Sequence, residues 1–378
     1  MERLLGRRRG IRAAGSLPQV LSSLGLVDQH AHGILREPPA TLDAFRGLFS
    51  ESGQPEQWPH VATSATYRRA IRELASFLGC EPTESAVYER RLATPADEYA
   101  SSLLRATGTE WLLLDDGFPA PDEGEGWQRM GELAGCASAP VLRIERVAEE
   151  ALAAGERRLD ELLERVRDAV TRARAGGWAA LKTIAAYRSG LDVGPPDDAA
   201  AAEALARGGR RLEAKPLVDA VLHAALEANE RAGPLPVQVH CGFGDEDLLL
   251  PAARPGLLGS LLERYRATPF VLLHCYPFVR EAGWLAHVYA NVCFDLSLTI
   301  PHVARPAEAL REALELAPFS KLMYASDAAR TPELYFLAAR WWREALAEVL
   351  PELLATAEVE EAARAILREN ALRLYGLA

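Results

Sequence analysis

Histidine and aspartate residues end several apolar segments of this chain. The five residues of this kind are His30 and His32, which form a His-Ala-His motif, together with His240, His274 and Asp327. Imidazole nitrogens combined with a carboxylate are ligands suited to zinc and other divalent metal ions. If the fold brings these side chains together, they predict a metal centre that leaves a position open for water.

The segments that end in these residues are short and continuously apolar, and helix-like stretches separate them. Eight such segments occur, at 24–32, 110–117, 139–146, 178–187, 235–243, 270–277, 292–298 and 321–328. Continuous apolarity is typical of parallel strands that are covered on both faces. Eight strands alternating with helices predict an α/β fold, a (β/α)8 TIM barrel, whose usual size covers this length.

A barrel of this kind would gather the polar residues at one end. His30 and His32 are two residues apart in a strand, so both side chains would face the barrel interior. Lys182, the other two histidines and Asp327 lie in or at the ends of later strands, where barrel enzymes build their active sites. Each residue alone has another interpretation: a chance motif, a hydrogen-bonded core histidine, a helix-capping aspartate or a paired lysine. The combination favours a metal site.

The connections between the predicted strands differ in length. The first, 33–109, has apolar residues at helical spacing and is interpreted as a helical insertion over the barrel mouth. The fourth, 188–234, has room for two helices, and its 194–205 stretch is expected to form a mobile loop. We expect a single domain over 1–378.

The composition excludes several classes of protein. The 378 residues include 42 basic and 53 acidic side chains, and the net charge of −11 argues against a nucleic-acid partner. No apolar run approaches the ~20 residues that span a membrane. The five cysteines form no Cys-X-X-Cys pair, as expected of free thiols in a reducing cytoplasm. We expect a cytoplasmic protein with a small-molecule substrate, and a homodimer is compatible with the sequence.

The order and spacing of these residues resemble the amidohydrolase superfamily. That superfamily has a His-X-His on strand one, histidines on strands five and six, an aspartate on strand eight and a closing helix like 366–373 here. The finer resemblance is to the amidohydrolase-like domain fused ahead of glutamine synthetase in some fungal and plant proteins, and to free-standing bacterial relatives. It rests on LKTIAAYRSGL (181–191), VHCGFGDEDLLL (239–250), LLHCYPFVREAGWLA (272–286), YASDAARTPELYFLA (324–338), LLLDDGF (112–118) and RIER (143–146).

The resemblance implies a metal-dependent hydrolase that cleaves a C–N (amide) bond. It implies that His30, His32, His240 and Asp327 surround a divalent metal, with Zn²⁺ expected and Mn²⁺ or Fe²⁺ as alternatives. His274 would bind a second ion or steady the oxyanion, and a carboxylated Lys182 would bridge two ions; without the carboxylate, one ion is expected. Asp327 would pass a proton from water to the leaving amine.

Charged and aromatic residues that follow the strands are candidates for substrate binding, namely Arg143, Glu145, Tyr187, Arg188, Asp245 and Arg330. Arg143 or Arg188 would clamp a carboxylate, and Glu145 or Asp245 would take an α-ammonium, unless these charges pair with one another. The link to glutamine synthetase suggests a γ-glutamyl amide. Two alternatives stay open: a metal-dependent decarboxylase of the same superfamily, and a non-catalytic scaffold.

Overall fold

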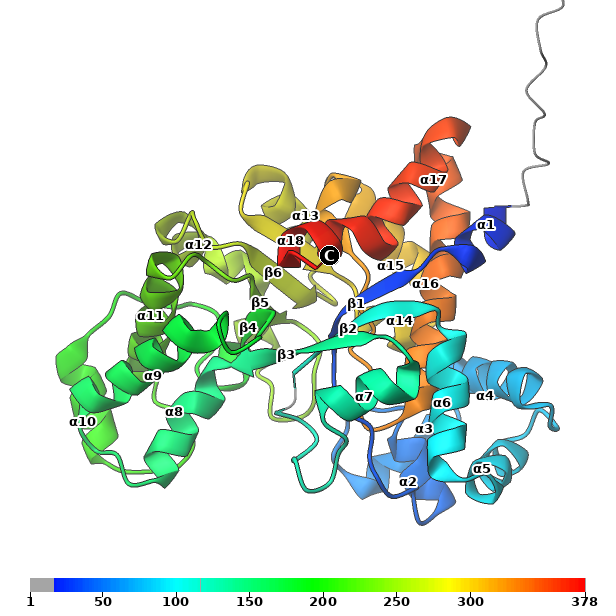
Figure 1. Cartoon of the computed structure of the whole chain (residues 1–378), viewed down its shortest axis with the longest axis horizontal. Helices are drawn as coiled ribbons and strands as arrows, with labels where there is room; N and C mark the ends of the chain where they lie inside the picture. Colours follow the sequence, from blue (N-terminus) through cyan, green and yellow to red (C-terminus); the bar gives the residue numbers. More distant parts are fainter. Residues whose placement is uncertain (1–16, 116, 378) are drawn as a thin grey trace, which may run out of the picture.

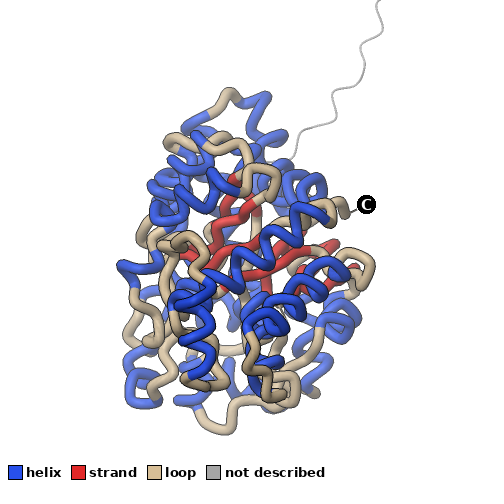
Figure 2. Tube along the Cα trace, turned by 90° about the vertical axis from the view of Figure 1, so that its left-hand side faces the viewer, coloured by secondary structure: helices blue, strands red, loops and turns tan. Residues whose placement is uncertain are grey.

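Eight parallel strands form the centre of the molecule in a computed structural model that describes residues 17–115 and 117–377. Figure 2 shows these strands surrounded by helices. The strands follow chain order around the sheet: β1 (Leu26–Ala31), β2 (Thr109–Leu114), β3 (Ala137–Arg143), β4 (Ala180–Thr183), β5 (Val237–Cys241), β6 (Phe270–His274), β7 (Val292–Asp295) and β8 (Leu322–Met323).

Backbone hydrogen bonds between β1 and the segment after β8 bring the two edges of the sheet together. Asp327 N donates to His30 O at 3.0 Å, and His32 N donates to Ala328 O at 2.9 Å. The sheet is therefore a nearly closed barrel, and the predicted (β/α)8 fold is confirmed. Each of the eight predicted segments contains or overlaps a strand.

Helices cover the outside of the barrel (Figure 1). Their bounds are α1 (Leu17–Ser23), α2 (Leu42–Gly47), α3 (Trp58–Val61), α4 (Ala65–Leu78), α5 (Glu84–Ala93), α6 (Ala96–Ala106), α7 (Trp127–Ala134), α8 (Ile144–Ala153), α9 (Leu159–Ala173), α10 (Asp198–Ala206), α11 (Lys215–Arg231), α12 (Gly259–Arg264), α13 (Val279–Val288), α14 (Thr299–His302), α15 (Pro306–Leu314), α16 (Pro332–Leu353), α17 (Thr356–Arg364) and α18 (Asn370–Tyr375), with a π-helical turn, Ala365–Glu369, before the last. No described helix is long and apolar enough to cross a membrane.

The first connection contains helices α2 to α6, as its periodicity predicts. Helix α4 begins where Ser64 accepts a hydrogen bond from Tyr67 N, and it ends at Gly79, whose φ of 65° is the left-handed conformation favoured by glycine. The face that carries Tyr67, Ile71 and Leu74 is buried. The division of the chain into domains stays a prediction.

The prediction of a mobile loop at 194–205 is wrong, because helix α10 occupies most of this stretch. Asp197 caps this helix by accepting a hydrogen bond from Ala200 N at 3.0 Å. The stretch is rich in alanine, the residue with the highest helix propensity, and that propensity together with the cap outweighs the prolines that precede the helix.

Helix α16 joins the first connection to the barrel, and it runs beside α4 and α6 in Figure 1. Trp342 Nε1 donates to Ala325 O at 3.1 Å, just after β8, whereas Trp341 Nε1 donates to Glu73 Oε2 at 2.9 Å on α4. On the same helix, the fully buried Glu333 forms an ion pair with Arg91 of α5. These contacts fix the position of the inserted helices against the carboxyl ends of the strands.

Candidate metal centre

The six predicted metal-site residues lie on strands β1, β4, β5 and β6, directly after β1 and in the segment after β8, and they meet inside the barrel. The ring centroids of His30 and His32 are 5.0 Å apart, and those of His240 and His274 are 4.4 Å apart. The ring centroids of His30 on β1 and His274 on β6 are 5.8 Å apart. All four histidines and Asp327 are buried.

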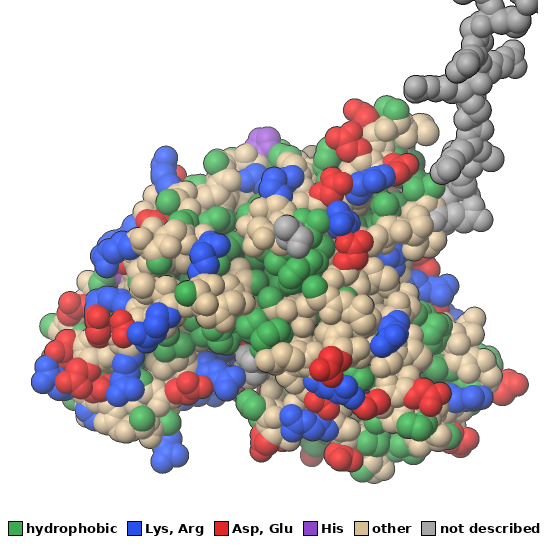
Figure 3. Space-filling view, in the orientation of Figure 1, with side chains coloured by type: hydrophobic (Ala, Val, Ile, Leu, Met, Phe, Trp, Pro, Cys, Tyr) green, Lys and Arg blue, Asp and Glu red, His purple; other side chains and the backbone are tan. Residues whose placement is uncertain are grey.

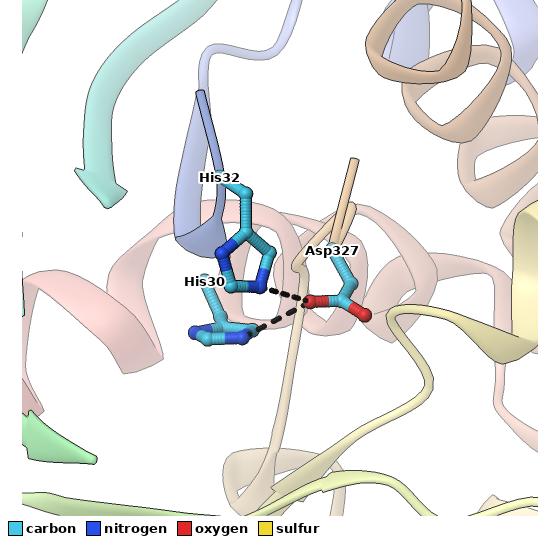
Figure 4. Close-up of side chains that lie close together, drawn as sticks. All are labelled: His30, His32 and Asp327. Atoms are coloured by element: carbon cyan, nitrogen blue, oxygen red, sulfur yellow. Dashed lines mark ion pairs between the residues drawn. The ribbon is translucent and has the colours of Figure 1, made fainter. Parts of the chain in front are cut away.

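Asp327 lies at the centre of this group. Its Oδ1 is 3.0 Å from His30 Nε2 and 3.3 Å from His32 Nε2, and Figure 4 shows both rings directed at the carboxylate. Its Oδ2 is 3.4 Å from His274 Nδ1. The backbone of Asp327 has a φ of 50° and that of His274 a φ of 67°, conformations that L side chains rarely adopt. Such strain is concentrated at functional sites.

The partners behind the histidine rings determine which nitrogen faces Asp327. Gln238 Oε1 lies 2.9 Å from His30 Nδ1, and the amide of Gln238 is oriented because its Nε2 donates to Gln29 O at 2.6 Å. His32 Nδ1 donates to Asp115 O at 2.9 Å. Both Nδ1 atoms therefore carry the proton, and both Nε2 atoms present lone pairs to Asp327 Oδ1. Three acceptor atoms that converge in this way can hold a metal ion between them.

His240 and His274 supply two further nitrogens of the same kind. Neither Nε2 atom has a hydrogen-bond partner among the described residues, although both are buried. His274 Nδ1 donates to Ser297 Oγ at 2.7 Å, because the Ser297 hydroxyl itself donates to Asp295 Oδ1 at 2.8 Å. An unpaired buried acceptor is costly, and a metal ion removes that cost. This tautomer suits a metal ligand, and the role of His274 in steadying an oxyanion stays a prediction.

The electrostatic environment keeps these groups in the forms that bind metals. Burial, assisted by the positive charge of Lys182, lowers the pKa of His30 to about 4 and that of His240 to about 3. Burial also lowers the pKa of His274 well below its usual value. Neutral imidazoles and an ionised carboxylate fit a divalent ion.

Lys182 lies beside the histidines, with its Nζ 3.1 Å from His30 Nε2. Burial lowers the pKa of this amine to about 8, although nearby carboxylates oppose the change. A lysine at this position can donate to His30 as it stands. It also lies where a carboxylated lysine would bring a further oxygen to the group.

A cavity of about 540 Å³ opens onto these residues, and we call it the metal-site cavity. It is lined by His32, Lys182, His240, His274 and Asp327 at its floor and by several arginines on its walls. In Figure 3 the outline of the molecule is notched between the inserted helices and the group of helices α8–α11.

The predicted substrate-binding arginines line this cavity, and each already has a partner. Arg143 donates to Asp115 Oδ2 from Nε at 3.0 Å and from Nη2 at 2.6 Å. Arg188 Nη2 is 3.0 Å from Glu149 Oε1. Arg330 donates to a backbone carbonyl, Ser50 O, at 2.7 Å. Arg330 therefore keeps an uncompensated positive charge beside the cavity, since no carboxylate within ion-pairing distance of it is found in the described chain.

Tyr187 and Asp245 also line the metal-site cavity, whereas Glu145 does not. Glu145 is fully buried and accepts a hydrogen bond from the Thr183 hydroxyl, so a substrate ammonium cannot reach it. Strand β3 ends at Arg143 and α8 begins at Ile144, so the alternation of side chains that would place Glu145 beside Arg143 stops one residue too early.

Several cavity residues were not predicted from the sequence, namely Glu51, Phe118, Glu149, Arg210, Arg211, Asp247, Leu298 and Ala329. Gln238 was also missed, although it stands two residues before His240 and therefore on the same face of β5. Glu51, Arg210 and Arg211 come from long connections, where no periodic pattern indicates which residues turn toward the barrel.

The comparisons with known proteins agree with the predicted resemblance. A family model described as amidohydrolase matches residues 128–377. Protein fluG of Emericella nidulans is 31% identical over 96% of this chain. The chain spans about half the length of that relative, 47% of it.

Solved structures have the same fold. A Lactobacillus casei protein, provisionally described as a metal-dependent hydrolase, superposes with a TM-score of 0.87 at 28% identity and covers 96% of this chain and 97% of its own. A uronate isomerase from Bacillus halodurans superposes with a TM-score of 0.64 at 14% identity, covering 95% of each chain, which shows the fold alone. The family match over 128–377 and the fluG similarity over almost the whole chain together show that this protein belongs to the amidohydrolase family.

Proposed function

We propose that this protein is a metal-dependent hydrolase that cleaves the amide C–N bond of a small substrate bearing a carboxylate, such as a γ-glutamyl amide. The observation that carries the proposal is the convergence of unprotonated nitrogens and one carboxylate: His30 Nε2 and His32 Nε2 lie 3.0 and 3.3 Å from Asp327 Oδ1. The unpartnered Nε2 atoms of His240 and His274 support a site for one or two ions.

The candidate ligands are His30, His32, His240 and Asp327, with His274 and a carboxylated Lys182 as ligands of a second ion. When bound, a divalent ion lowers the pKa of water to about 7 and polarises a carbonyl group. Asp327 would accept the proton of the attacking water at its carboxylate and deliver it to the nitrogen of the leaving amine. Gln238 and Asp115 O would keep the two β1 histidines in the required tautomer and orientation.

The walls of the metal-site cavity support a substrate with an anionic group. Arg330 has no carboxylate partner among the described residues, and a guanidinium binds a carboxylate through paired hydrogen bonds. Arg188 is a second candidate, because the Glu149 that it pairs with also lies at the cavity wall. Asp245 and Tyr187 remain candidates for the opposite end of the substrate.

The experiment that tests this proposal is elemental analysis of the purified protein before and after incubation with zinc, manganese or iron(II). The His30→Ala/His32→Ala variant serves as the control, with circular dichroism to show that it folds. We expect one or two equivalents of metal in the wild type and a loss of metal in the control. Two equivalents would favour a carboxylated Lys182. The absence of metal after reconstitution would overturn the proposal and favour a scaffold.

The reaction is tested by screening the metal-loaded protein against γ-glutamyl amides and other amides, with amine release as the readout. Aromatic acids are included, and release of CO2 is measured. Amine release that depends on Asp327 supports the hydrolase. Release of CO2 without any amide cleavage would contradict it and establish the decarboxylase alternative instead.

A further inference from the structure

A second cavity lies beside the metal-site cavity, between the inserted helices and the barrel. Its volume is about 620 Å³, and we call it the outer cavity. Its walls come from the α2–α4 region, the loop after β5, α14 and α16. Glu51 and Asp245 line both cavities, so the two cavities are adjacent.

The two cavities differ in charge. The metal-site cavity has five arginines and one lysine among its lining residues, together with five carboxylates: Glu51, Glu149, Asp245, Asp247 and Asp327. The outer cavity has Glu51, Asp245 and Glu246, and no lysine or arginine is found among the described residues that line it. Burial raises the pKa of the Asp245 carboxyl, and repulsion from Asp247, Glu51 and Glu246 adds to this effect. A bound cation would relieve that repulsion.

His302 adds a buried acceptor to the outer cavity. Its side chain is only 9% exposed, and its Nδ1 donates to Leu298 O at 2.9 Å. In the neutral ring the lone pair is therefore on Nε2, and this atom has no hydrogen-bond partner among the described residues. Glu51 Oε1, the carboxylate oxygen paired with it, is 3.8 Å away. This buried acceptor, independent of the acidic residues, calls for a ligand that donates hydrogen bonds.

Aromatic rings complete the outer cavity. Phe49, Tyr67, Phe243 and Trp341 line it, and the ring of Phe243 meets that of His302 edge-on at 5.7 Å. Aromatic faces attract an ammonium group and pack against an alkyl chain. Carboxylates, a histidine acceptor and aromatic rings together form an environment suited to an alkylammonium ion.

We propose that the outer cavity binds a protonated amine, carried by the amine portion of an amide whose carbonyl group lies at the metal centre. This inference rests on the proposed function and names its substrate class: amides in which one nitrogen of a diamine is acylated and the other is free. In the reaction the water oxygen bonds to the carbonyl carbon, the C–N bond breaks, and both protons of the water end on the released nitrogen, which leaves a carboxylate and an ammonium group. The distal ammonium is unchanged, and the anionic acyl portion lies among the arginines.

The inference is tested by binding, without any need for turnover. Titration calorimetry at about pH 7.5, where an alkylamine is protonated, compares N-(4-aminobutyl)acetamide with the neutral N-butylacetamide. We expect the cationic amide to bind at least about tenfold more tightly to the wild type, as paired charges in a partly buried site allow. Glu51→Gln and His302→Phe should each reduce that ratio several-fold.

Glu263→Gln, which makes the same charge change on exposed α12, is the matched control and should keep the full ratio. Thermal unfolding identifies any variant that fails to fold; if His302→Phe does, Glu51→Gln decides the question alone. Equal affinity for the two amides, or a ratio unaffected by Glu51→Gln, would overturn the inference. A cation preference without hydrolysis of any amide would overturn the proposed function and leave the outer cavity as a cation-binding site.

Discussion

The metal-site cavity and the outer cavity share Glu51 and Asp245 but draw their remaining walls from different parts of the fold. The floor of the first comes from β1, β4, β5, β6 and the turn after β8, and hydrogen bonds behind the rings hold its histidines in place. Much of the wall of the second comes from the inserted helices. The comparison suggests that the barrel strands determine the chemistry, whereas the insertion determines which amine is accepted.

The largest expected effect is that of Asp327→Asn, which affects only the metal-site cavity. The amide cannot replace the charge that three histidines surround, nor can it accept the proton of water. Loss of a residue that only positions a metal ligand costs about 10–100-fold in metal affinity or activity, and we expect more than about a hundredfold from loss of the ligand itself. Amine release under saturating zinc measures this effect.

The same variant sharpens the comparison between the cavities. Asp327 does not line the outer cavity, so the preference for the cationic acetamide over the neutral one should survive in Asp327→Asn. If the preference disappears together with turnover, the two cavities do not act separately. Normal turnover in this variant would contradict the proposed role of Asp327.

The second largest effect is expected from Arg91→Met, which removes the ion pair between Arg91 of the inserted helix α5 and Glu333 of α16. Arg91 and Glu333 are buried, and Tyr99 OH and Thr331 also contact the same carboxylate. Removal of one partner leaves an unpaired buried charge and should destabilise the protein by about 3–5 kcal/mol. Denaturant unfolding measures the change.

Arg91→Met should affect the outer cavity more than the metal centre. Because the inserted helices supply much of the outer wall, we expect the cation preference to fall while zinc stoichiometry is retained. The double substitution Arg91→Met/Glu333→Gln restores neutrality and should recover part of the stability. A variant as stable as the wild type would show that this ion pair does not hold the insertion.

Gln238→Leu should have a smaller effect, about 10–100-fold on zinc affinity. The substitution removes the acceptor that keeps the proton on His30 Nδ1, and it also ends the contact with Tyr375 OH at 3.1 Å. A competition titration with a chelator measures the affinity. Tyr375→Phe, which leaves the Gln238–His30 contact intact, should change it less. Equal losses in both variants would mean that the C-terminal helix, and not the histidine tautomer, controls the site.

The residues of the metal-site cavity and those of the outer cavity differ in how far they could be predicted from the sequence. His30 and His32 were predictable because a strand places alternate residues on one face, and Asp327 and His274 because parallel strands end at the same side of a barrel. Gln238 obeys the same rule relative to His240 and could have been found in that way. For strand-borne residues, local periodicity was enough to predict where they meet.

The outer cavity could not be predicted because its residues meet only through tertiary packing. Glu51 lies between two short helices, and His302 is the last residue of the four-residue helix α14. Neither segment is long enough to have a periodicity that indicates a buried face. Glu145 shows the converse error: it is predicted to lie at a strand end, but β3 ends two residues earlier, at Arg143, and α8 begins at Ile144. The conformation of the loops at the barrel mouth determines which side chains face the substrate. That conformation depends on contacts between residues far apart in the sequence.

The smallest effect is expected from His223→Gln, a substitution outside both cavities. This variant should change the pH dependence of stability without changing that of activity. His223 on α11 is buried; its Nε2 donates to Gly194 O at 2.8 Å, so its Nδ1 accepts from Tyr265 OH at 2.6 Å. Burial lowers the pKa of this histidine, which means that the folded protein favours the neutral ring. The unfolded chain binds a proton below about pH 6.5, so the stability contributed by His223 is present above that pH and is lost as the pH falls through it. His223→Gln should therefore unfold at a lower temperature than the wild type at pH 8, with a smaller difference at pH 5.

Because His223 touches neither cavity, the same variant should leave the pH profile of amine release unchanged. A shifted activity profile would show that the region around His223 and the metal centre are coupled.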